Sequence, residues 1–382
     1  MPWRSESVME QRVKFVIEAQ RKEKTHAALC REYGVSRPTG YLWLNRYKQA
    51  SSLNGLQERS RRPHHSPGRT DRAIEELVLE LRDKTGWGAP KLQFVLANKG
   101  TVMARATVHR ILVREGRVGD ERKSLKKATK RFARKQCNEL AQMDFKGEYQ
   151  LRGRQKCYPL SLLDDCSRYL HGLWPLPSTA GEGVYRSLLG HFKEVGVPQA
   201  MLMDHGTPWF STQNQQGLTW VAVWLIKQGV VLKYSGVGHP QTQGKVERFH
   251  RTLKSRTKQR GVPATMSEWS CWAEEFRREY NHERPHESLN MKTPAEVYRS
   301  KNLRPYQEHP HEWEYHSGNV KKLDGYGMLY FRGGAYFVCE ALAHERVRID
   351  QLDDKLVVTF RHLTIREIDL RTAKSFPVLL KL

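Results

Sequence analysis

Three carboxylates in this sequence stand where acidic side chains can do chemistry. Asp144 lies inside the strand-like segment Q-M-D-F-K-G, Asp204 directly follows the apolar segment Q-A-M-L-M, and Glu247 lies early in the helical segment Q-T-Q-G-K-V-E-R-F-H. A charge inside a buried strand costs free energy unless another group compensates it. Ligands gather at the carboxyl ends of strands in open α/β sheets. We therefore expect these three side chains to converge on one cleft.

A cleft lined by three carboxylates predicts a divalent metal site. Like charges held together repel each other, and hard cations with oxygen ligands relieve that repulsion. Two Mg²⁺ ions about 3.5–4 Å apart activate the attacking oxygen and stabilise the leaving oxygen in phosphoryl transfer. Taken singly, each residue has an ordinary alternative: Asp144 on an exposed edge strand, Asp204 in a turn, and Glu247 on a solvent-facing helix surface. Their combination, on those elements and in that order, favours the shared site.

Other acidic residues fit a shared site less well. Asp164 and Asp165 end a predicted strand and are expected to form the turn that follows it. Glu148 has the same strand parity as Asp144 but lies about 13 Å further along the strand. Neither position is expected to join the metal cluster.

A basic helix face adjoins Glu247. His250, Arg251 and Lys254 follow it at spacings of three, four and seven residues, which predicts one shared face. Basic groups beside a metal-binding carboxylate suit a substrate whose phosphates run along that face, so these residues are DNA-binding candidates. The alternative is an ordinary surface ion pair between Glu247 and Arg251, which contributes only a few tenths of a kcal/mol.

An α/β segment must position the three carboxylates. Residues 138–300 begin with short apolar strands and continue with alternating helices and strands, which predicts a mixed sheet. The expected strands are 140–149, 157–163, 168–173, 199–203 and 230–234, and the expected helices are 181–195, 218–228 and one that starts near 241. Residues 312–382 return to short strands and turns, which predicts a small SH3-like β-barrel.

A helix-turn-helix module is predicted for residues 1–55. Apolar periodicity indicates three helices there, with a glycine turn before a capped third helix. The candidate DNA-facing residues on that third helix are Arg37, Thr39, Gly40 and Trp43. Plain helical packing without DNA binding is the alternative for this module.

A second helix-turn-helix-like domain is predicted for residues 71–116, after a basic linker at residues 56–70. Its last helix carries Thr107 and Arg110 as DNA-facing candidates. The linker either tracks a phosphate backbone or is a solvated spacer. Residues 117–137 form a basic arm directly before the first strand of the α/β segment, where contact with nucleic acid is expected.

The charge balance of the chain points to the same partner. The 382 residues include 65 Lys and Arg against 41 Asp and Glu, a formal charge of +24, and 38% hydrophobic residues argue against a disordered polycation. No segment approaches the ~20 apolar residues of a membrane span, and M-P-W-R-S-E-S-V-M-E lacks an apolar signal core. The six cysteines form no C-x-x-C pair, which predicts reduced thiols without a disulfide or zinc frame. We expect a cytoplasmic protein that binds nucleic acid and no membrane.

The segment from residue 138 to residue 298 resembles the catalytic core of DDE-type insertion-sequence transposases, which share a retroviral-integrase core. The matching motifs are E-L-A-Q-M-D-F-K-G, L-L-D-D-C-S-R-Y, L-M-D-H-G-T-P-W-F, H-P-Q-T-Q-G-K-V-E-R-F-H-R-T-L-K and Y-N-H-E-R-P-H-E-S-L-N-M-K-T-P-A-E-V-Y. The resemblance implies an RNase H-like fold with Asp144, Asp204 and Glu247 as the catalytic and metal-binding triad. The helical modules and the carboxy-terminal strands fit the same family, so the likeness covers nearly the whole chain.

The sequence departs from the family pattern at two places. The family usually has Asn after the second Asp, where this chain has His205. The stretch between Asp204 and Glu247 is also longer than is usual, and we place the additional residues around 211–220, ahead of the next helix. The G-K-V-E-R context predicts that Glu247 keeps its place.

The resemblance implies a bacterial transposase, associated with the nucleoid. It would bind the terminal inverted repeats of its element and catalyse Mg²⁺-dependent 3′-end cleavage and strand transfer into target DNA. Two Mg²⁺ ions per active site, with Mn²⁺ able to substitute, and a homodimer or larger assembly on DNA are implied as well. Two alternatives stay open: a non-catalytic sequence-specific DNA-binding regulator derived from a transposase, and an RNase H-like nuclease without strand transfer.

Overall fold

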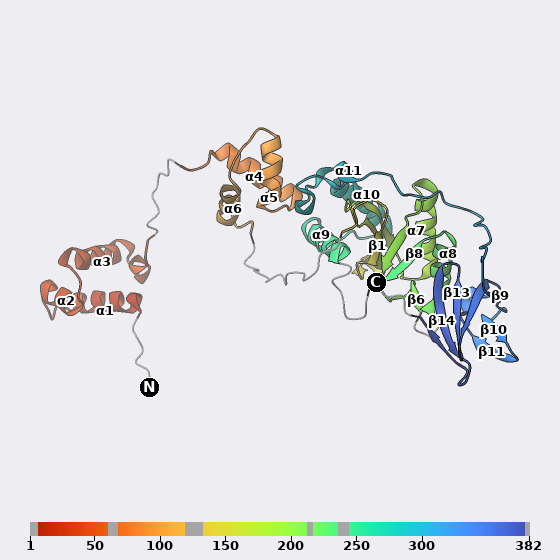
Figure 1. The fold of residues 1–382 in the computed structure, drawn as a ribbon. Helices are drawn as coiled ribbons and strands as arrows, with labels where there is room; N and C mark the ends of the chain where they lie inside the picture. The colour runs from red at the N-terminus through yellow and green to blue at the C-terminus, as the bar shows by residue number, and fades with distance from the viewer. Residues whose placement is uncertain (1–6, 60–67, 119–132, 212–216, 236–243, 379–382) are drawn as a thin grey trace. The chain divides into compact units, whose positions relative to one another are not determined.

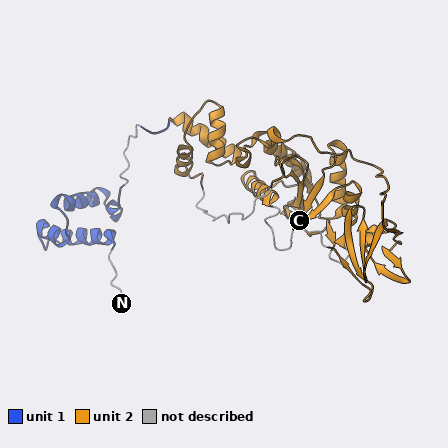
Figure 2. Ribbon diagram, viewed as in Figure 1, with its two compact units in different colours: residues 1–70 blue, residues 71–382 orange. Residues whose placement is uncertain are grey.

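A computed structural model describes residues 7–59, 68–118, 133–211, 217–235 and 244–378. The chain divides into two compact units, residues 1–70 and residues 71–382, shown in different colours in Figure 2. Among the described residues, no helix is both long and apolar enough to span a membrane. Most of the predicted linker, most of the basic arm and part of the stretch between Asp204 and Glu247 lie outside the described residues.

The first unit is a three-helix module. It consists of α1 (Val8–Arg21), α2 (His26–Glu32) and α3 (Arg37–Ala50), followed by a short 3₁₀ turn, η1 (Leu53–Leu56). Ser7, Thr25 and Ser36 cap these helices by accepting backbone N–H groups of the first turn. The core holds Phe15, Val16, Leu29, Cys30 and Leu56. The predicted helix-turn-helix arrangement is confirmed.

A second helical module opens the larger unit. Helices α4 (Arg72–Thr85), α5 (Ala89–Asn98) and α6 (Arg105–Arg114) pack around a core of their own. Lys91 on α5 forms an ion pair of 2.6 Å with Glu287. Arg256 on α9 (Gly244–Arg260) donates to the Lys84 carbonyl at 2.7 Å. The module is therefore fixed to the α/β domain by contacts from two separate elements.

The α/β domain is built on a mixed six-stranded sheet (Figure 1). Its strands are β1 (Ala141–Phe145), β2 (Tyr149–Gln150), β3 (Lys156–Asp164), β4 (Leu170–Leu176), β5 (Ala200–Met203) and β8 (Val231–Tyr234). β3 pairs antiparallel with β1, β2 and β4, whereas β1 with β5 and β5 with β8 are parallel pairs. The prediction of a mixed sheet is confirmed.

Helices cover both faces of this sheet. On one face, α7 (Gly181–Glu194) and α8 (Trp220–Lys227) share a core with Met143, Met201 and Met203. On the other face, α9 and α10 (Met266–Arg278) bury Phe249 and Trp269 against residues of β3 and β4. Side chains alternate along β1, so the residues on either side of Met143 are directed toward α9. Short elements complete the domain: η2 (Arg152–Arg154), a π-helical turn η5 (Glu279–Glu283), η6 (Glu287–Leu289) and α11 (Pro294–Val297).

The carboxy-terminal strands form an open sheet. Five of them pair antiparallel in the order β15-β14-β13-β12-β9, and β10 with β11 forms a separate hairpin. The strands are β9 (Asn319–Lys322), β10 (Met328–Phe331), β11 (Gly334–Phe337), β12 (Arg346–Leu352), β13 (Lys355–Phe360), β14 (Leu363–Asp369) and β15 (Lys374–Pro377). Over the described residues the two outer strands, β9 and β15, do not pair with each other, so the predicted closed barrel is not confirmed. The β10–β11 hairpin instead meets β15 through a side chain, because the Ser375 hydroxyl donates to the Phe337 carbonyl at 2.6 Å.

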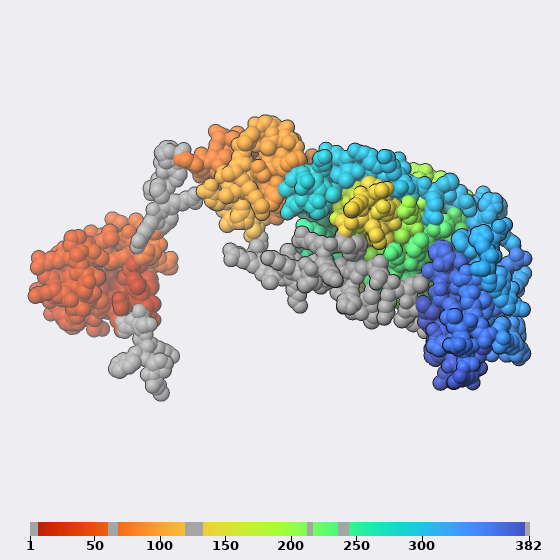
Figure 3. Space-filling view, in the orientation of Figure 1, coloured from red at the N-terminus to blue at the C-terminus, as the bar shows by residue number. Residues whose placement is uncertain are grey.

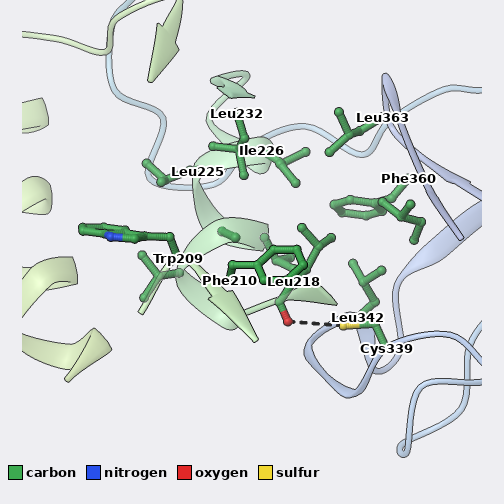
Figure 4. Close-up of a cluster of buried hydrophobic side chains, with 14 of the residues drawn as sticks. Trp209, Phe210, Leu218, Leu225, Ile226, Leu232, Cys339, Leu342, Phe360 and Leu363 are labelled. Atoms are coloured by element: carbon green, nitrogen blue, oxygen red, sulfur yellow. Dashed lines mark hydrogen bonds between the residues drawn. The ribbon is translucent and has the colours of Figure 1, made fainter. Parts of the chain in front are cut away.

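The carboxy-terminal sheet and the α/β domain share one hydrophobic core. Leu225, Leu232, Phe360 and Leu363 belong to the same buried cluster, part of which is drawn in Figure 4. Between Asp204 and Glu247, strands β6 (Phe210–Ser211) and β7 (Gly217–Leu218) pair with each other. The Cys339 thiol donates to the Leu218 carbonyl at 3.5 Å. In the space-filling view of Figure 3 the blue carboxy-terminal residues lie directly against the α/β domain. The stretch after Asp204 thus contacts the carboxy-terminal part of the chain through Leu218.

Candidate metal-dependent active site

Strand β1 is a central strand of the sheet and places Asp144 near its carboxyl end. Its neighbour across the β1–β3 ladder is Ser161, whose hydroxyl donates to the Asp144 carbonyl at 2.9 Å. The Asp144 side chain is 21% exposed. It is therefore mostly buried but still accessible to a ligand.

Strand β5 brings Asp204 beside Asp144. The parallel register pairs Ala141 with Met201 and Gln142 with Leu202. Continued by two residues, this register sets Asp144 across from Asp204 on strands that lie about 4.8 Å apart. The Gly206 N–H donates to Asp204 Oδ1 at 3.1 Å, which fixes the carboxylate in the turn after β5.

Helix α9 presents Glu247 from its first turn, where the side chain is exposed. Burial, and then the charges of Asp204 and Glu247, raise the pKa of Asp144 from its ordinary 3.8 to about 7. Carboxylates that influence each other in this way share one electrostatic site. The structure thus brings together the three carboxylates that the sequence pattern predicts.

The site has the chemistry of a divalent cation site. Its donors are carboxylate oxygens, which Mg²⁺ prefers. The pKa of Asp144 is raised first by burial and then by repulsion from Asp204 and Glu247, and a bound cation would offset both effects. Within the described part of the chain, Cys137, Asp164 and Cys166 are the one group of three whose ligand atoms all lie within 4.8 Å of one another. The carboxylate oxygens of Asp144, Asp204 and Glu247 therefore do not all lie within 4.8 Å of one another.

The Cys137, Asp164 and Cys166 group does not have the properties of a metal site. The Asp164 carboxylate already accepts the N–H of Asn138 at 2.7 Å and both the N–H and the hydroxyl of Ser167 at 2.7 and 2.6 Å. Burial raises the pKa of the Cys166 thiol to about 11, which keeps it protonated at neutral pH. The six cysteines, all within the described ranges, are not joined by disulfides.

His250 is buried beside Asp144 and does not lie on the exposed side of α9 that holds Arg251 and Lys254. Its Nε2 is 2.9 Å from the Ser161 hydroxyl, and its Nδ1 is 3.6 Å from Asp144 Oδ2. Burial, helped by Lys146, lowers the pKa of His250 to about 3, so the imidazole is neutral at neutral pH. The predicted position on the basic face is not observed, because His250 belongs to the inward stripe that also holds Phe249.

Arg251 and Lys254 are exposed on α9, as the helix periodicity predicts. On α6, Arg110 is exposed, and one of its guanidinium nitrogens donates to the Thr107 hydroxyl at 3.2 Å. These positions are open to a nucleic acid.

The candidate residues of α3 have mixed environments. Arg37 is exposed in the first turn, and the Thr39 hydroxyl lies 2.8 Å from the hydroxyl of the capping Ser36. Trp43 is half-buried, with the guanidinium of Arg12 3.7 Å from its ring centre. Gly40 is buried against α2 and α1 and cannot face DNA. A Cβ at Gly40 would lie 2.6 Å from Cys30 Sγ, so this glycine is needed for packing.

Sequence reasoning missed the residues that hold α9 against the sheet. Asp165, predicted to form a turn, is fully buried and pairs with Lys245 on α9. Gln142, two residues before Asp144, contacts both Asp165 and α9. The available signal was strand parity, since Gln142 and Asp144 share one side of β1.

Comparison with known proteins identifies an integrase core and a helix-turn-helix domain in this chain. Residues 134–240 and 228–294 match two models described as "Integrase core domain", residues 11–64 match a "Helix-turn-helix domain", and residues 39–112 match a "Homeodomain-like domain". The "Insertion element IS407 uncharacterized 31.7 kDa protein" of Burkholderia multivorans is 25% identical over 260 residues, which cover 65% of this chain and 89% of that protein.

Two solved structures are distant likenesses. The catalytic core domain of HTLV-2 integrase in complex with magnesium has 13% identity and a TM-score of 0.33, over 42% of this chain and 97% of that one. A simian T-cell lymphotropic virus intasome in complex with PP2A regulatory subunit B56 gamma has 13% identity and a TM-score of 0.37, over 79% and 98%. Through the matched integrase core, the matched helix-turn-helix domain and the insertion-element relative, the chain is similar to insertion-sequence transposases that carry an RNase H-like integrase core.

Proposed function

We propose that the protein cleaves the ends of an insertion element at their 3′ strands and joins them to target DNA. The observation that carries this proposal is the meeting of Asp144, Asp204 and Glu247. The β1–β5 register sets Asp144 across from Asp204, and burial, followed by the charges of Asp204 and Glu247, raises the pKa of Asp144 to about 7. Magnesium ions held there, two in the proposed site and replaceable by Mn²⁺, would supply an activated oxygen nucleophile and stabilise the leaving oxygen. The chain's own contribution is to hold the ligands and to align the DNA.

DNA alignment is the proposed task of the basic residues. Arg251 and Lys254 lie exposed on the helix that carries Glu247, where they would bind phosphates next to the cleaved bond. The far end of the same helix is fixed to the second helical module, because Arg256 donates to the Lys84 carbonyl at 2.7 Å and Gln259 to the Asp83 carbonyl at 2.5 Å. A repeat read by α6 would therefore lie at a set distance from the carboxylates.

The proposed partners are the terminal inverted repeats and the target DNA. Arg37, Thr39 and Trp43 of α3 and Thr107 and Arg110 of α6 would contact the repeats. Joining an element requires two ends at once, so we propose that a homodimer or larger assembly forms on DNA. Such work would place the protein at the bacterial nucleoid.

A plasmid assay tests the proposal. A supercoiled target plasmid is incubated with labelled terminal repeats, the purified protein and MgCl₂, and products are separated on a gel. Joined products support strand transfer, whereas nicks alone support a nuclease without transfer. A protein that binds the repeats but neither nicks nor joins them would be the non-catalytic regulator, and the proposal would fail.

A further inference from the structure

Asp165 is the centre of a buried polar cluster beside the carboxylate site. Its side chain is completely buried. One oxygen accepts the Gln142 side-chain amide at 2.7 Å and lies 2.5 Å from Lys245 Nζ; the other accepts the backbone N–H of Arg134 at 2.8 Å. The cluster therefore joins the turn after β3, strand β1, the end of the basic arm and helix α9.

Gln142 ties the same cluster to the backbone of α9. Its side-chain oxygen accepts the N–H of Val246 at 3.2 Å, while its amide nitrogen donates to Asp165. The first N–H groups of a helix have no partner within the helix, so an outside acceptor fixes its first turn. Gln142 also shares its side of β1 with Asp144. One side chain thus links the strand of the first carboxylate to the helix of the third.

Lys245 and Val246, the two residues of α9 that contact the cluster, directly precede Glu247. Helix α9 begins at Gly244, so Lys245 and Val246 form the turn from which Glu247 projects. The main chain of Asp165 is fixed too, because its N–H donates to the Leu140 carbonyl at 2.9 Å. A movement of this turn would displace Glu247 relative to Asp144.

We propose that Gln142, Asp165 and Lys245 form a positioning latch that sets Glu247 at the working distance from the two aspartates. The latch deepens the proposed function and rests on it. The alternative roles for Lys245 are a DNA contact and a purely stabilising ion pair. Its side chain is only 15% exposed, which disfavours a DNA contact. Buried ion pairs often give little net stability, which disfavours the second role.

The test uses variants that leave no lone buried charge. Lys245→Met with Asp165→Asn removes both charges together, and Gln142→Met removes the bridge without changing any charge. Lys193→Met is the matched control, because Lys193 forms an exposed ion pair of 3.6 Å with Glu308. Four quantities are measured on the full-length protein: the melting temperature, the affinity for repeat DNA at several salt concentrations, the single-turnover cleavage rate against MgCl₂, and Mn²⁺ binding by calorimetry without DNA.

The latch predicts a specific pattern. Groups that orient metal ligands typically contribute about 10–100-fold to metal affinity or activity. The double variant and Gln142→Met should therefore lose about 10–100-fold in cleavage rate and bind Mn²⁺ about 10-fold more weakly. Their DNA affinity and its salt dependence should stay within about twofold of the wild type, and Lys193→Met should match the wild type throughout.

Three results would overturn the latch. One is a wild-type cleavage rate and Mn²⁺ affinity in either folded variant. Another is a fall in DNA affinity with a weaker salt dependence in the double variant, which would make Lys245 a phosphate contact. The third is a lower melting temperature with unchanged Mn²⁺ affinity, which would make the cluster only stabilising. A wild-type protein that never cleaves refutes the proposed function, while Mn²⁺ binding still decides the latch.

Discussion

Replacing Asp144 by asparagine is predicted to stabilise the metal-free protein at alkaline pH. In the folded chain this carboxyl has a pKa of about 7 instead of 3.8, because it is buried beside Asp204 and Glu247. Between these two pH values the folded chain binds the proton more tightly than the unfolded chain. The contribution of Asp144 to the free energy of unfolding therefore falls as the pH rises from about 4 to about 7.

The size of this effect follows from the two pKa values. The difference between the two pKa values means that Asp144 lowers the free energy of unfolding by about 4 kcal/mol at pH 8, where it is ionised. At pH 5 it lowers the free energy of unfolding by less than about 2 kcal/mol. Because the Asp144 side chain is only 21% exposed, solvent screening reduces these figures little. Asp144→Asn removes the charge, so its gain in stability over the wild type should be about 2–3 kcal/mol larger at pH 8 than at pH 5.

Urea denaturation in the presence of a chelator measures this difference. The free energies of unfolding of wild type and Asp144→Asn are compared at pH 5 and pH 8. Asp353→Asn, an exposed change in the turn between β12 and β13, is the control and should follow the wild type at both pH values. A stability gain that is equal at both pH values, or a loss at pH 8, would refute the electrostatic account of the site.

Three further predictions concern other parts of the chain. Gly40→Ala should destabilise the first unit by about 1–3 kcal/mol, measured by thermal unfolding, because the added Cβ meets Cys30 Sγ at 2.6 Å; an unchanged melting curve would contradict this. Arg251→Ala and Lys254→Ala should each weaken DNA binding and lower the salt slope by about one, measured by fluorescence anisotropy; unaltered slopes would remove these residues from the interface. Phe360→Ala should cost about 3–5 kcal/mol and loosen both sheets together, as followed by hydrogen exchange, because Phe360 belongs to their shared core; opening of the carboxy-terminal sheet alone would contradict a shared core.

Local patterns in the sequence predict most of the helices and strands and single out the three candidate metal-binding carboxylates. Capping residues such as Thr25 and Ser36 mark helix starts directly, and apolar runs bounded by polar residues mark the strands. Asp144 and Asp204 could be found because strand identity and strand ends are local properties. Their adjacency then follows from the parallel pairing of β1 with β5.

Long-range pairing could not be predicted in the same way. Whether β9 meets β15 depends on strand registers and bends, which leave no local mark, so a closed barrel was expected where the sheet is open. His250 turns inward because the buried stripe of α9, which includes Phe249, sets the rotation of the helix. Asp165 is buried because its partner Lys245 comes from a distant part of the chain. Its position after a strand predicted only a turn.

The central claim is that Asp144, Asp204 and Glu247 together hold the metal that cleaves DNA. Its most direct test is Mg²⁺-dependent cleavage of terminal-repeat DNA by the wild type, Asp204→Asn and Glu247→Gln at equal occupancy of DNA. The account predicts that each variant binds the repeats with wild-type affinity and cleaves at least about 100-fold more slowly. Cleavage by either variant at the wild-type rate would contradict it.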